Sequence, residues 1–317
     1  MVVKVFICCL RGTHMREAKY IWLNGELVPW KEAKVHVLSH ALHYGTGVFE
    51  GLRCYETPQG PAIFRPRDHF RRMLNGTRLY GIEMPYGVEE LVGATKELIR
   101  ANGLSSCYIR PIAFFGYGEM GVRPKGCGVD VAIAAWEWGK YLGEASVNGV
   151  RVMVSSWRRI SRETLMPMVK CSGHYVNSML ASREASLAGY DEAIMLNQDG
   201  YVAEGPGENV FLVKDGGLIT PSLSSCILPG ITRDTVIELA RDMGLEVSER
   251  EVLRDELYTA DELFFAGTAV EITPIVEVDG IRIGDGRPGE ITEKVRDAYY
   301  RAVRGEEERY RKWLEYV

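Results

Sequence analysis

The sequence predicts an α+β fold in two domains. Segments with the alternating pattern of strands and segments with the 3.6-residue period of helices are mixed along the chain without strict alternation. At 317 residues the chain is longer than one hydrophobic core usually organises. The pattern breaks at residues 136–148, which we interpret as a linker between a small domain, residues 1–135, and a larger domain, residues 149–317.

In the first domain, hydrophobic patterning predicts strands over residues 35–38, 47–55, 107–115 and 130–136. Two helices are expected to begin near Asp68 and near Val88. The second helix has an apolar stripe at helical spacing, and Gly103 is a typical stop for it. Residues 1–19 are interpreted as an extension, because the recognisable pattern begins at Tyr20.

In the second domain, the patterning predicts strands over residues 150–155, 192–197 and 208–213, with an Asp-Gly turn at 199–200. Helices are expected over residues 174–187, 232–243 and 291–303. The tail, residues 306–317, is charged and amphipathic, and we expect it to pack against the surface.

Composition and charge exclude several classes of function. A hydrophobic fraction of 46% and a charged fraction of 26% are ordinary for a globular protein, and no apolar run is long enough for a bilayer. A net charge of −5 without a long basic run argues against nucleic acid as a partner. Seven scattered cysteines lack zinc spacing. Residues 1–14 lack a signal-peptide cleavage site, which favours a cytoplasmic location, and a small-molecule enzyme is expected.

Lys170 is the first candidate catalytic residue. It lies between apolar Met168 and Val169 and the small residues 171–173, a setting that suits a buried stem with its amine in a cleft. Burial disfavours the ammonium form, so such an amine can act as a nucleophile. Glu204 follows 34 positions later among small residues. An amine for a Schiff base and an acid for a pyridine nitrogen are what pyridoxal phosphate requires, although Glu204 could also be a turn carboxylate that faces water.

The segment Leu228 to Asp234 is a candidate phosphate site. Gly230 stands just before a predicted helix, whose free N–H groups, with the Thr232 hydroxyl, would suit an anion. Simple helix capping is the alternative interpretation. Residues 116–121 match GxGxxG, but Pro124 and its neighbours cannot begin the helix that a dinucleotide site needs, so we expect a loop over the cleft.

Four further motifs stand in order along the chain, at residues 40–53, 64–69, 108–111 and 267–274. With Lys170 and Glu204 they resemble the branched-chain amino acid aminotransferases of the fold type IV pyridoxal phosphate family, from about Tyr20 to the C-terminus. The resemblance implies a larger domain with a β-barrel-like core and a two-stage transamination of Leu, Ile or Val with 2-oxoglutarate. It makes Lys170 the Schiff-base lysine and Glu204 the partner of the ring nitrogen.

The same resemblance assigns the remaining site residues. It places the phosphate at Arg65, Ile231, Thr232 and Thr268, and the ring hydroxyl at Tyr175. The α-carboxylate is assigned to Tyr108, Thr268 and the Ala269 N–H, the side-chain carboxylate of glutamate to Arg110, and the apolar wall to Phe49, Trp138, Tyr141 and Tyr44 of a neighbouring subunit. A homodimer is therefore the minimum unit, with a hexamer left open and no metal expected.

His174 departs from the family pattern, which often has Asn, as does Pro206 where Ala is common; substrate breadth therefore stays open. Two rivals share the fold, the lysine and the glutamate: a D-amino acid aminotransferase and an aminodeoxychorismate lyase. The run Tyr108-Ile109-Arg110 argues against both. A pyridoxal phosphate carrier without turnover is the alternative of another class, and the complete set of amine, acid and carboxylate-binding groups argues against it.

Overall fold

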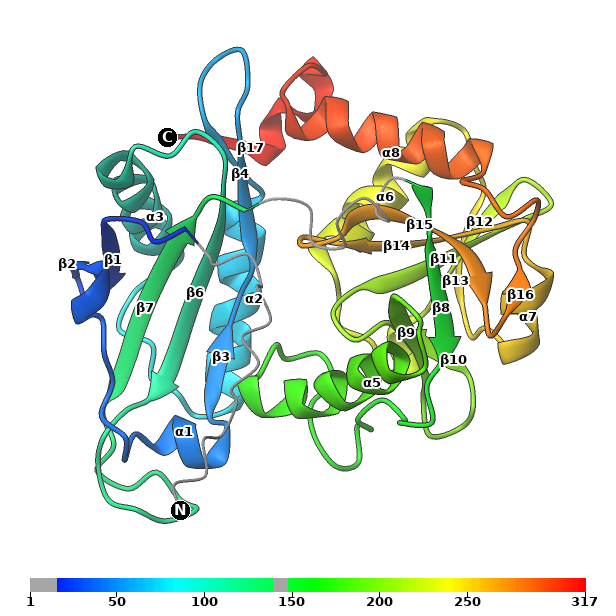
Figure 1. Cartoon of the computed structure of the whole chain (residues 1–317). Helices are drawn as coiled ribbons and strands as arrows, with labels where there is room; N and C mark the ends of the chain where they lie inside the picture. Colours follow the sequence, from blue (N-terminus) through cyan, green and yellow to red (C-terminus); the bar gives the residue numbers. More distant parts are fainter. Residues whose placement is uncertain (1–15, 139–147) are drawn as a thin grey trace, which may run out of the picture.

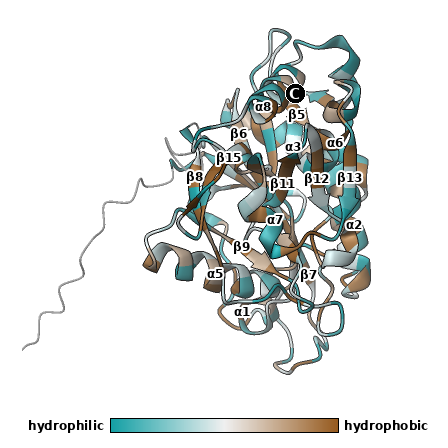
Figure 2. Ribbon diagram, turned by 90° about the vertical axis from the view of Figure 1, so that its right-hand side faces the viewer, coloured by the Kyte–Doolittle hydropathy of each residue, from teal (hydrophilic) through white to brown (hydrophobic). Residues whose placement is uncertain are grey.

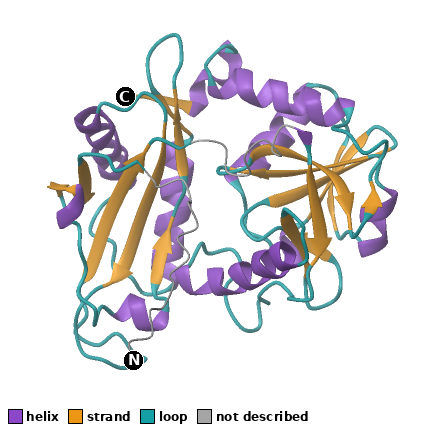
Figure 3. Cartoon of the chain, in the orientation of Figure 1, coloured by secondary structure: helices purple, strands orange, loops and turns teal. Residues whose placement is uncertain are grey.

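The structure, a computed structural model, describes residues 16–138 and 148–317. Two β-sheets with their helices lie side by side (Figure 1), and the sheets face a common central region. Figure 3 shows that helices flank both sheets. The first sheet comes from the first half of the chain plus the last strand, and the second sheet comes from the second half.

Eight strands of the described residues form the first sheet, in the order β17-β5-β4-β6-β7-β1-β2, with β3 paired to β6. The strands are β1 (Tyr20–Leu23), β2 (Glu26–Pro29), β3 (Gly47–Phe49), β4 (Leu52–Tyr55), β5 (Ala62–Phe64), β6 (Cys107–Phe115), β7 (Val129–Trp136) and β17 (Leu314–Tyr316). The helical segments of this half are η1 (Trp30–Glu32), α1 (His40–Tyr44), α2 (Pro66–Leu79) and α3 (Val88–Asn102).

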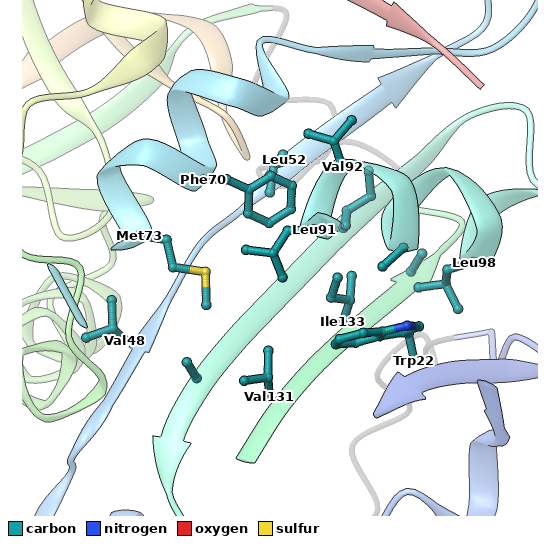
Figure 4. Packing of buried hydrophobic residues seen from close by; sticks show 14 of the residues in the cluster. Trp22, Val48, Leu52, Phe70, Met73, Leu91, Val92, Leu98, Val131 and Ile133 are labelled. Atoms are coloured by element: carbon teal, nitrogen blue, oxygen red, sulfur yellow. The ribbon is translucent and has the colours of Figure 1, made fainter. Parts of the chain in front are cut away.

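Helices α2 and α3 pack on the first sheet because each has one apolar face. Leu91 and Leu98 of α3 are fully buried, and they lie in one cluster with Phe70 and Met73 of α2. Figure 4 shows these side chains between the helices and the strands, with Trp22 of β1 at the far end. Burial of this size supplies the main stabilising free energy of such a layer.

Nine strands of the described residues form the second sheet, which curls into a half-barrel in the order β10-β9-β8-β15-β14-β11-β12-β13, with β16 paired to β15. The strands are β8 (Val150–Val154), β9 (Glu192–Leu196), β10 (Val202–Glu204), β11 (Asn209–Lys214), β12 (Gly217–Pro221), β13 (Val247–Arg250), β14 (Glu262–Gly267), β15 (Glu271–Val278) and β16 (Ile281–Arg282). The helical segments are η2 (Ser172–His174), α5 (Tyr175–Leu187), η3 (Leu223–Ser225), α6 (Ile231–Asp242), α7 (Arg254–Thr259), α8 (Glu290–Val303) and η4 (Glu308–Trp313).

The central strands of the second sheet are buried on both faces. All of Asn209–Val213 in β11 is buried, and Figure 2 shows the hydrophobic colour of β11 and β12 inside the molecule. One apolar cluster lies between this sheet and helices α6 and α8, and it also includes Tyr55 and Phe64 of the first half. The two halves therefore share part of one core.

Most predicted elements are confirmed within one or two residues, including β6, β7, α3 and α6. The strand over residues 35–38 is wrong. This segment is a turn before α1, and Val35 and Val37 are 48% and 69% exposed. The strand over 47–55 is interrupted after β3 at the level of Pro111 in β6, because proline has no N–H for the ladder.

The prediction for the tail is only partly right. Residues 308–313 form η4, but residues 314–316 form strand β17, which pairs antiparallel with β5 of the first sheet. Tyr310 and Trp313 are buried in the core shared by both halves. The chain thus returns to its first sheet, and the domain boundaries at residues 135 and 149 stay a prediction.

Membrane-spanning helices, metal-binding clusters, cysteines and the GxGxxG segment can each be described for the part of the chain that the structure covers. None of the helices within residues 16–138 and 148–317 is long and apolar enough to cross a membrane. In the same residues, no group of three or more His, Cys, Asp or Glu side chains is placed to bind a metal ion. Five cysteines of this part are free thiols, namely Cys54, Cys107, Cys127, Cys171 and Cys226. The GxGxxG segment, residues 116–121, is a loop with no helix after it, as predicted.

Candidate active site

A cavity lies where elements of both halves meet, with about 560 Å³ of space between atoms, part of which is open to solvent. The first half contributes the residue before β4, the start of β6 and helix α2. The second half contributes the loop before η2 that carries Lys170, here called the lysine loop, together with the end of β10, the start of α6 and the β14–β15 hairpin. Its lining consists of Gly51, Arg72, Tyr108, Arg159, Lys170, Tyr175, Glu204, Pro206, Gly207, Glu208, Asn209, Leu228, Gly230, Ile231, Thr232, Ala266, Gly267, Thr268 and Ala269.

Lys170 reaches this cavity from the loop before η2. Its Nζ lies 2.6 Å from the hydroxyl of Tyr175 and 5.0 Å from the centre of the Phe49 ring. The backbone N–H of Phe49 donates to the Lys170 carbonyl at 3.0 Å, which fixes the lysine loop against β3. The amine lies in a cleft as predicted, but the lysine is half-buried and not fully buried.

Glu204 ends β10 and is only 4% exposed, which excludes a turn carboxylate that faces water. Its Oε1 accepts a hydrogen bond from Nε of Arg159 at 2.7 Å, and its Oε2 accepts from Nδ2 of Asn209 and N–H of Leu228, both at 3.0 Å. Burial raises the pKa of Glu204, and the Arg159 guanidinium opposes that rise. The carboxylate is thus oriented by three donors at one wall of the cavity.

The N-terminus of α6 forms another part of the lining. Gly230 is the N-cap, and no side chain caps this end of the helix. A Cβ at Gly230 would lie 2.0 Å from Oδ1 of Asn209, so only glycine allows this close approach. Ile231 and Thr232 line the cavity here. The uncapped N–H groups and the helix dipole favour an anion at this point.

Arg72 is the cationic side chain beside this helix end. Its Nη1 donates to the Pro229 carbonyl at 2.7 Å, and its Nε and Nη2 donate to the two carboxylate oxygens of Glu50 at 2.7 and 2.8 Å. Glu50 is fully buried and also accepts from Nδ1 of His69 at 2.8 Å. The guanidinium and the His69 hydrogen bond hold the pKa of Glu50 far below its usual value, against the effect of burial.

These groups fit an elongated molecule with an anion at one end and a protonated nitrogen at the other. The anion would meet Arg72 and the α6 N-terminus, and the protonated nitrogen would meet the Glu204 carboxylate. Two buried polar atoms of the lining, Nη1 of Arg159 and Oε1 of Glu208, have no hydrogen-bond partner within the described residues. Such atoms normally find a partner, so the lining has polar capacity left for a bound group.

Comparison with known proteins agrees with this geometry. The family described as Amino-transferase class IV matches residues 47–278. The branched-chain-amino-acid aminotransferase of Escherichia coli strain K12 is 49% identical, over 95% of this chain and 98% of that protein. The chain belongs to the class IV aminotransferase family. The recognition of the family and of its fold is thereby confirmed.

Solved structures of the family superpose closely on the chain. The crystal structure of the Escherichia coli branched-chain amino acid aminotransferase has a TM-score of 0.92 and 48% identity, and covers 94% of this chain and 99% of that one. The T.th. branched-chain enzyme complexed with N-(5'-phosphopyridoxyl)-L-glutamate has a TM-score of 0.91 and 48% identity, and covers 95% and 99%. The cofactor of that relative agrees with the predicted pyridoxal phosphate.

Within this class IV fold, eight of the predicted site residues line one cavity. They come from distant parts of the sequence: Tyr108, Lys170, Tyr175, Glu204, Ile231, Thr232, Thr268 and Ala269. Three more lie directly behind the lining. Arg110 donates to the Tyr108 hydroxyl at 3.2 Å and lies over the Phe49 ring, and the Trp138 ring is 4.1 Å from that of Tyr108. Tyr141 falls outside the described residues.

Arg65 is the one predicted cofactor residue that the structure places elsewhere. Its guanidinium pairs with Asp68 and Asp234, each at 2.7 Å, and it is not part of the lining. Arg65 thus differs in position from the prediction, and Arg72, seven residues further along the chain, is the arginine of α2 that lines the cavity. Sequence reasoning also missed Arg159 and Asn209, the two side chains that hold Glu204.

His174, the departure noted in the sequence, is a packing residue. It is 2% exposed, with Nδ1 3.1 Å from the Val169 carbonyl and Nε2 2.7 Å from the Tyr80 hydroxyl. Burial lowers the pKa of His174 to about 4, so its ring is neutral at neutral pH. His174 thus connects the lysine loop to the C-terminal end of α2 and does not line the cavity.

Proposed function

We propose that this class IV aminotransferase depends on pyridoxal phosphate and moves the amino group between branched-chain L-amino acids and 2-oxoglutarate. The products would be branched-chain 2-oxo acids and L-glutamate. The observation that carries the proposal is the 2.6 Å contact of Lys170 Nζ with Tyr175, in the same cavity as a buried Glu204 and an uncapped helix N-terminus. The 49% identity to a named branched-chain enzyme supports the substrate class.

Pyridoxal phosphate, when bound, supplies an aldehyde that condenses with amines and a ring that accepts electrons. Lys170 would provide the amine for attachment and then carry the proton that leaves the substrate Cα. Tyr175, which contacts Lys170 Nζ, would orient that amine and meet the ring hydroxyl. Glu204 would accept the N–H of the ring nitrogen, and Arg159 and Asn209 would hold its carboxylate in place.

The phosphate would bind at the opposite end of the cavity. Arg72 offers a guanidinium there, and the N–H groups at Ile231 and Thr232 begin α6. Thr268 of the β14–β15 hairpin lines the same cavity and adds a hydroxyl. Glu50 keeps Arg72 oriented through two parallel hydrogen bonds.

The substrate would be recognised by groups from both halves. Tyr108, Thr268 and the Ala269 N–H would bind the α-carboxylate that all substrates share. Arg110 would pair with the side-chain carboxylate of glutamate, while leaving apolar surface for Leu, Ile or Val. The apolar wall would consist of Phe49, Trp138, Tyr141 and, from a second copy of the chain, Tyr44. A bare carboxylate in an apolar slot is costly, which is why a cation at its rim is required.

We also propose a homodimer as the minimum unit. Tyr44 lies on α1, is 41% exposed, and does not line the cavity of its own chain. Other exposed apolar side chains lie on α1 and on the loops that contact its ends, among them Val37, Leu42 and Tyr117. Assembly beyond a dimer and the cytoplasmic location stay predictions.

Two measurements test the proposal. The purified protein should absorb visible light, and incubation with L-leucine and 2-oxoglutarate should yield glutamate. Lys170→Ala should abolish turnover, and wild-type turnover in that variant would refute the role of the lysine. Activity with D-alanine and none with L-leucine would move the assignment to the D-amino acid aminotransferase. Arg65→Lys is the control for a general effect of substitution, because Arg65 stands at the N-cap of α2 and lies outside the lining.

A further inference from the structure

A buried cluster of hydrogen-bonding side chains joins the two halves of the molecule next to the cavity. We call it the Glu271 cluster, and its members are Arg53, Tyr55, Glu271, Tyr299 and Tyr300. Arg53 and Tyr55 belong to β4, Glu271 begins β15, and the other two tyrosines lie on α8. Tyr55 and Glu271 are each 8% exposed, so water is nearly excluded from the cluster.

The Glu271 carboxylate is the centre of this cluster. Its Oε1 pairs with Nη1 of Arg53 at 3.0 Å and accepts from the Tyr55 hydroxyl at 2.9 Å. Its Oε2 accepts from the Tyr300 hydroxyl at 3.0 Å. Burial, with the carboxylate nearby, raises the pKa of Tyr55 well above its usual value, so this hydroxyl keeps its proton and remains a donor. Three donors therefore hold one buried carboxylate.

The backbone at Glu271 is also unusual. Its φ of 54° lies in the left-handed region, which disfavours a residue with a Cβ. Glu271 follows the three-residue loop 268–270 of the β14–β15 hairpin and pairs with Gly267 across it. Glycine is the usual residue at this position of such a loop. A glutamate in this strained conformation indicates that its side chain has a role that glycine could not fill.

The position of the cluster suggests that purpose. Gly267, Thr268 and Ala269, which directly precede Glu271 in the hairpin, line the cavity. On the other side, Arg53 is the cross-strand partner of Tyr108, which also lines the cavity. The Glu271 cluster therefore links the hairpin of the second half to the strand pair of the first half that carries Tyr108.

We propose that the Glu271 cluster sets the spacing between the two sides of the substrate α-carboxylate site. Arg53, Tyr55 and Glu271 act as positioning residues, because none of them lines the cavity. The inference rests on the proposed function, which assigns Tyr108, Thr268 and Ala269 to that carboxylate. The α-carboxylate is common to the amino donor and the oxo acid acceptor. Loss of the cluster therefore weakens the binding of both substrates by a similar factor and leaves the preference among substrate side chains unchanged.

The direct test is the binding of a carboxylate that cannot react. 4-Methylpentanoic acid has the carboxylate and branched chain of leucine but no amino group, and its binding to the holoenzyme is followed by the visible absorption of the bound cofactor. The probe is expected to bind about tenfold more weakly to Tyr55→Phe, which loses a hydrogen bond to a buried charge. Glu271→Gly should show a similar loss while relieving the backbone strain, so it keeps the test open if Tyr55→Phe folds poorly.

Tyr310→Phe is the matched control. Tyr310 is also 8% exposed and also donates to a carboxylate, that of Asp242 at 2.7 Å, outside the cavity lining. This variant should lose stability as Tyr55→Phe does, but bind the probe with wild-type affinity. A merely structural role of the Glu271 cluster would make the two variants behave alike.

Steady-state kinetics give a second readout. In Tyr55→Phe and Glu271→Gly, KM should rise by a similar factor for L-leucine and for 2-oxoglutarate, with a smaller change in kcat. Wild-type probe affinity in both variants would overturn the inference. Failure of the wild-type protein to bind the cofactor or the probe would instead overturn the proposed function, so the two failures are distinguishable.

Discussion

Replacement of Glu50 by glutamine should weaken both the fold and the binding of the cofactor phosphate. Glu50 is fully buried and accepts three hydrogen bonds from side chains, two from Arg72 and one from His69, at 2.7 to 2.8 Å. An amide can accept through one oxygen only and carries no charge. The Arg72 guanidinium would then stay buried without its counter-ion and could turn away from the Pro229 carbonyl.

The size of the effect follows from these contacts. Removal of one partner of a buried ion pair costs about 3–5 kcal/mol of stability. Misplacement of Arg72 removes one charge-assisted hydrogen bond of roughly 1.5–3 kcal/mol from the phosphate, which corresponds to a roughly ten- to hundredfold weaker cofactor affinity. The pKa of Glu50 in the folded protein is lowered from 4.5, so its contribution is present above about pH 4.5 and is lost as the pH falls below that value.

Thermal unfolding and cofactor titration of Glu50→Gln measure the two effects. The difference in stability from wild type should be largest near neutral pH and should shrink below about pH 4.5. Glu315→Gln is the control, because Glu315 also pairs with two cations, Arg67 and Lys96, but lies outside the cavity lining. Unchanged cofactor affinity in Glu50→Gln would refute the role assigned to the Glu50–Arg72 pair.

Two other predictions separate neighbouring positions. Arg72→Lys should weaken cofactor binding measurably in a spectroscopic titration, because lysine cannot bond Glu50 and the phosphate side in parallel, whereas Arg65→Lys should leave it near wild type. Equal losses would contradict the assignment. Gly230→Ala should lower both Tm and cofactor affinity, since its Cβ would lie 2.0 Å from Oδ1 of Asn209. Gly93 lies in the middle of α3, and a Cβ there would meet no other atom, so Gly93→Ala should instead stabilise the protein by about 1 kcal/mol. A loss of stability in Gly93→Ala would show that the effect of Gly230→Ala does not come from the close contact with Asn209.

The elements that the sequence predicts well are those whose own residues decide them. Helix α3 has its stripe of buried side chains and its left-handed Gly103 at the end, and both features are local. Strand β7 is confirmed to within one residue, and its buried and half-buried side chains alternate along most of its length. The segment 35–38 has the same apolar character, but no neighbouring strand pairs with it, so its side chains stay exposed. Whether an apolar run finds a partner is a property of the fold and not of the run.

The C-terminal tail also shows that strand pairing cannot be predicted from local sequence. Its charged and aromatic residues predict an amphipathic segment, and Tyr310 and Trp313 do bury their rings. That residues 314–316 pair with β5 could not be read locally, because the two strands are about 250 residues apart in sequence. Pairing at such a separation depends on the arrangement of both halves.

For the site, the sequence indicates the reacting groups but not the groups that orient them. Lys170 and Glu204 stand in motifs whose chemistry is recognisable, and both line the cavity. Arg65 and Arg72 lie on the same short stretch of chain, and only the helix geometry decides which one faces the cavity. Seven residues are close to two turns of an α-helix, so the two side chains leave the same side of α2. Arg65, however, stands at the N-cap with φ of 49°, outside the helix, and its carboxylate partners hold it there.

The glycines around the lysine loop suggest why the motif at residues 40–53 is needed although few of its residues line the cavity. Gly45 ends α1 with φ of 66°, and a Cβ there would lie 2.7 Å from the Cα of Gly173, three residues after Lys170. The Gly173 N–H donates to the Gly45 carbonyl at 3.0 Å, and the Phe49 N–H donates to the carbonyl of Lys170. The motif therefore clamps the backbone on both sides of the lysine. A flexible four-carbon side chain can present its amine at one fixed point only if its backbone is fixed first, so the first half contributes to the reaction through the position of the lysine.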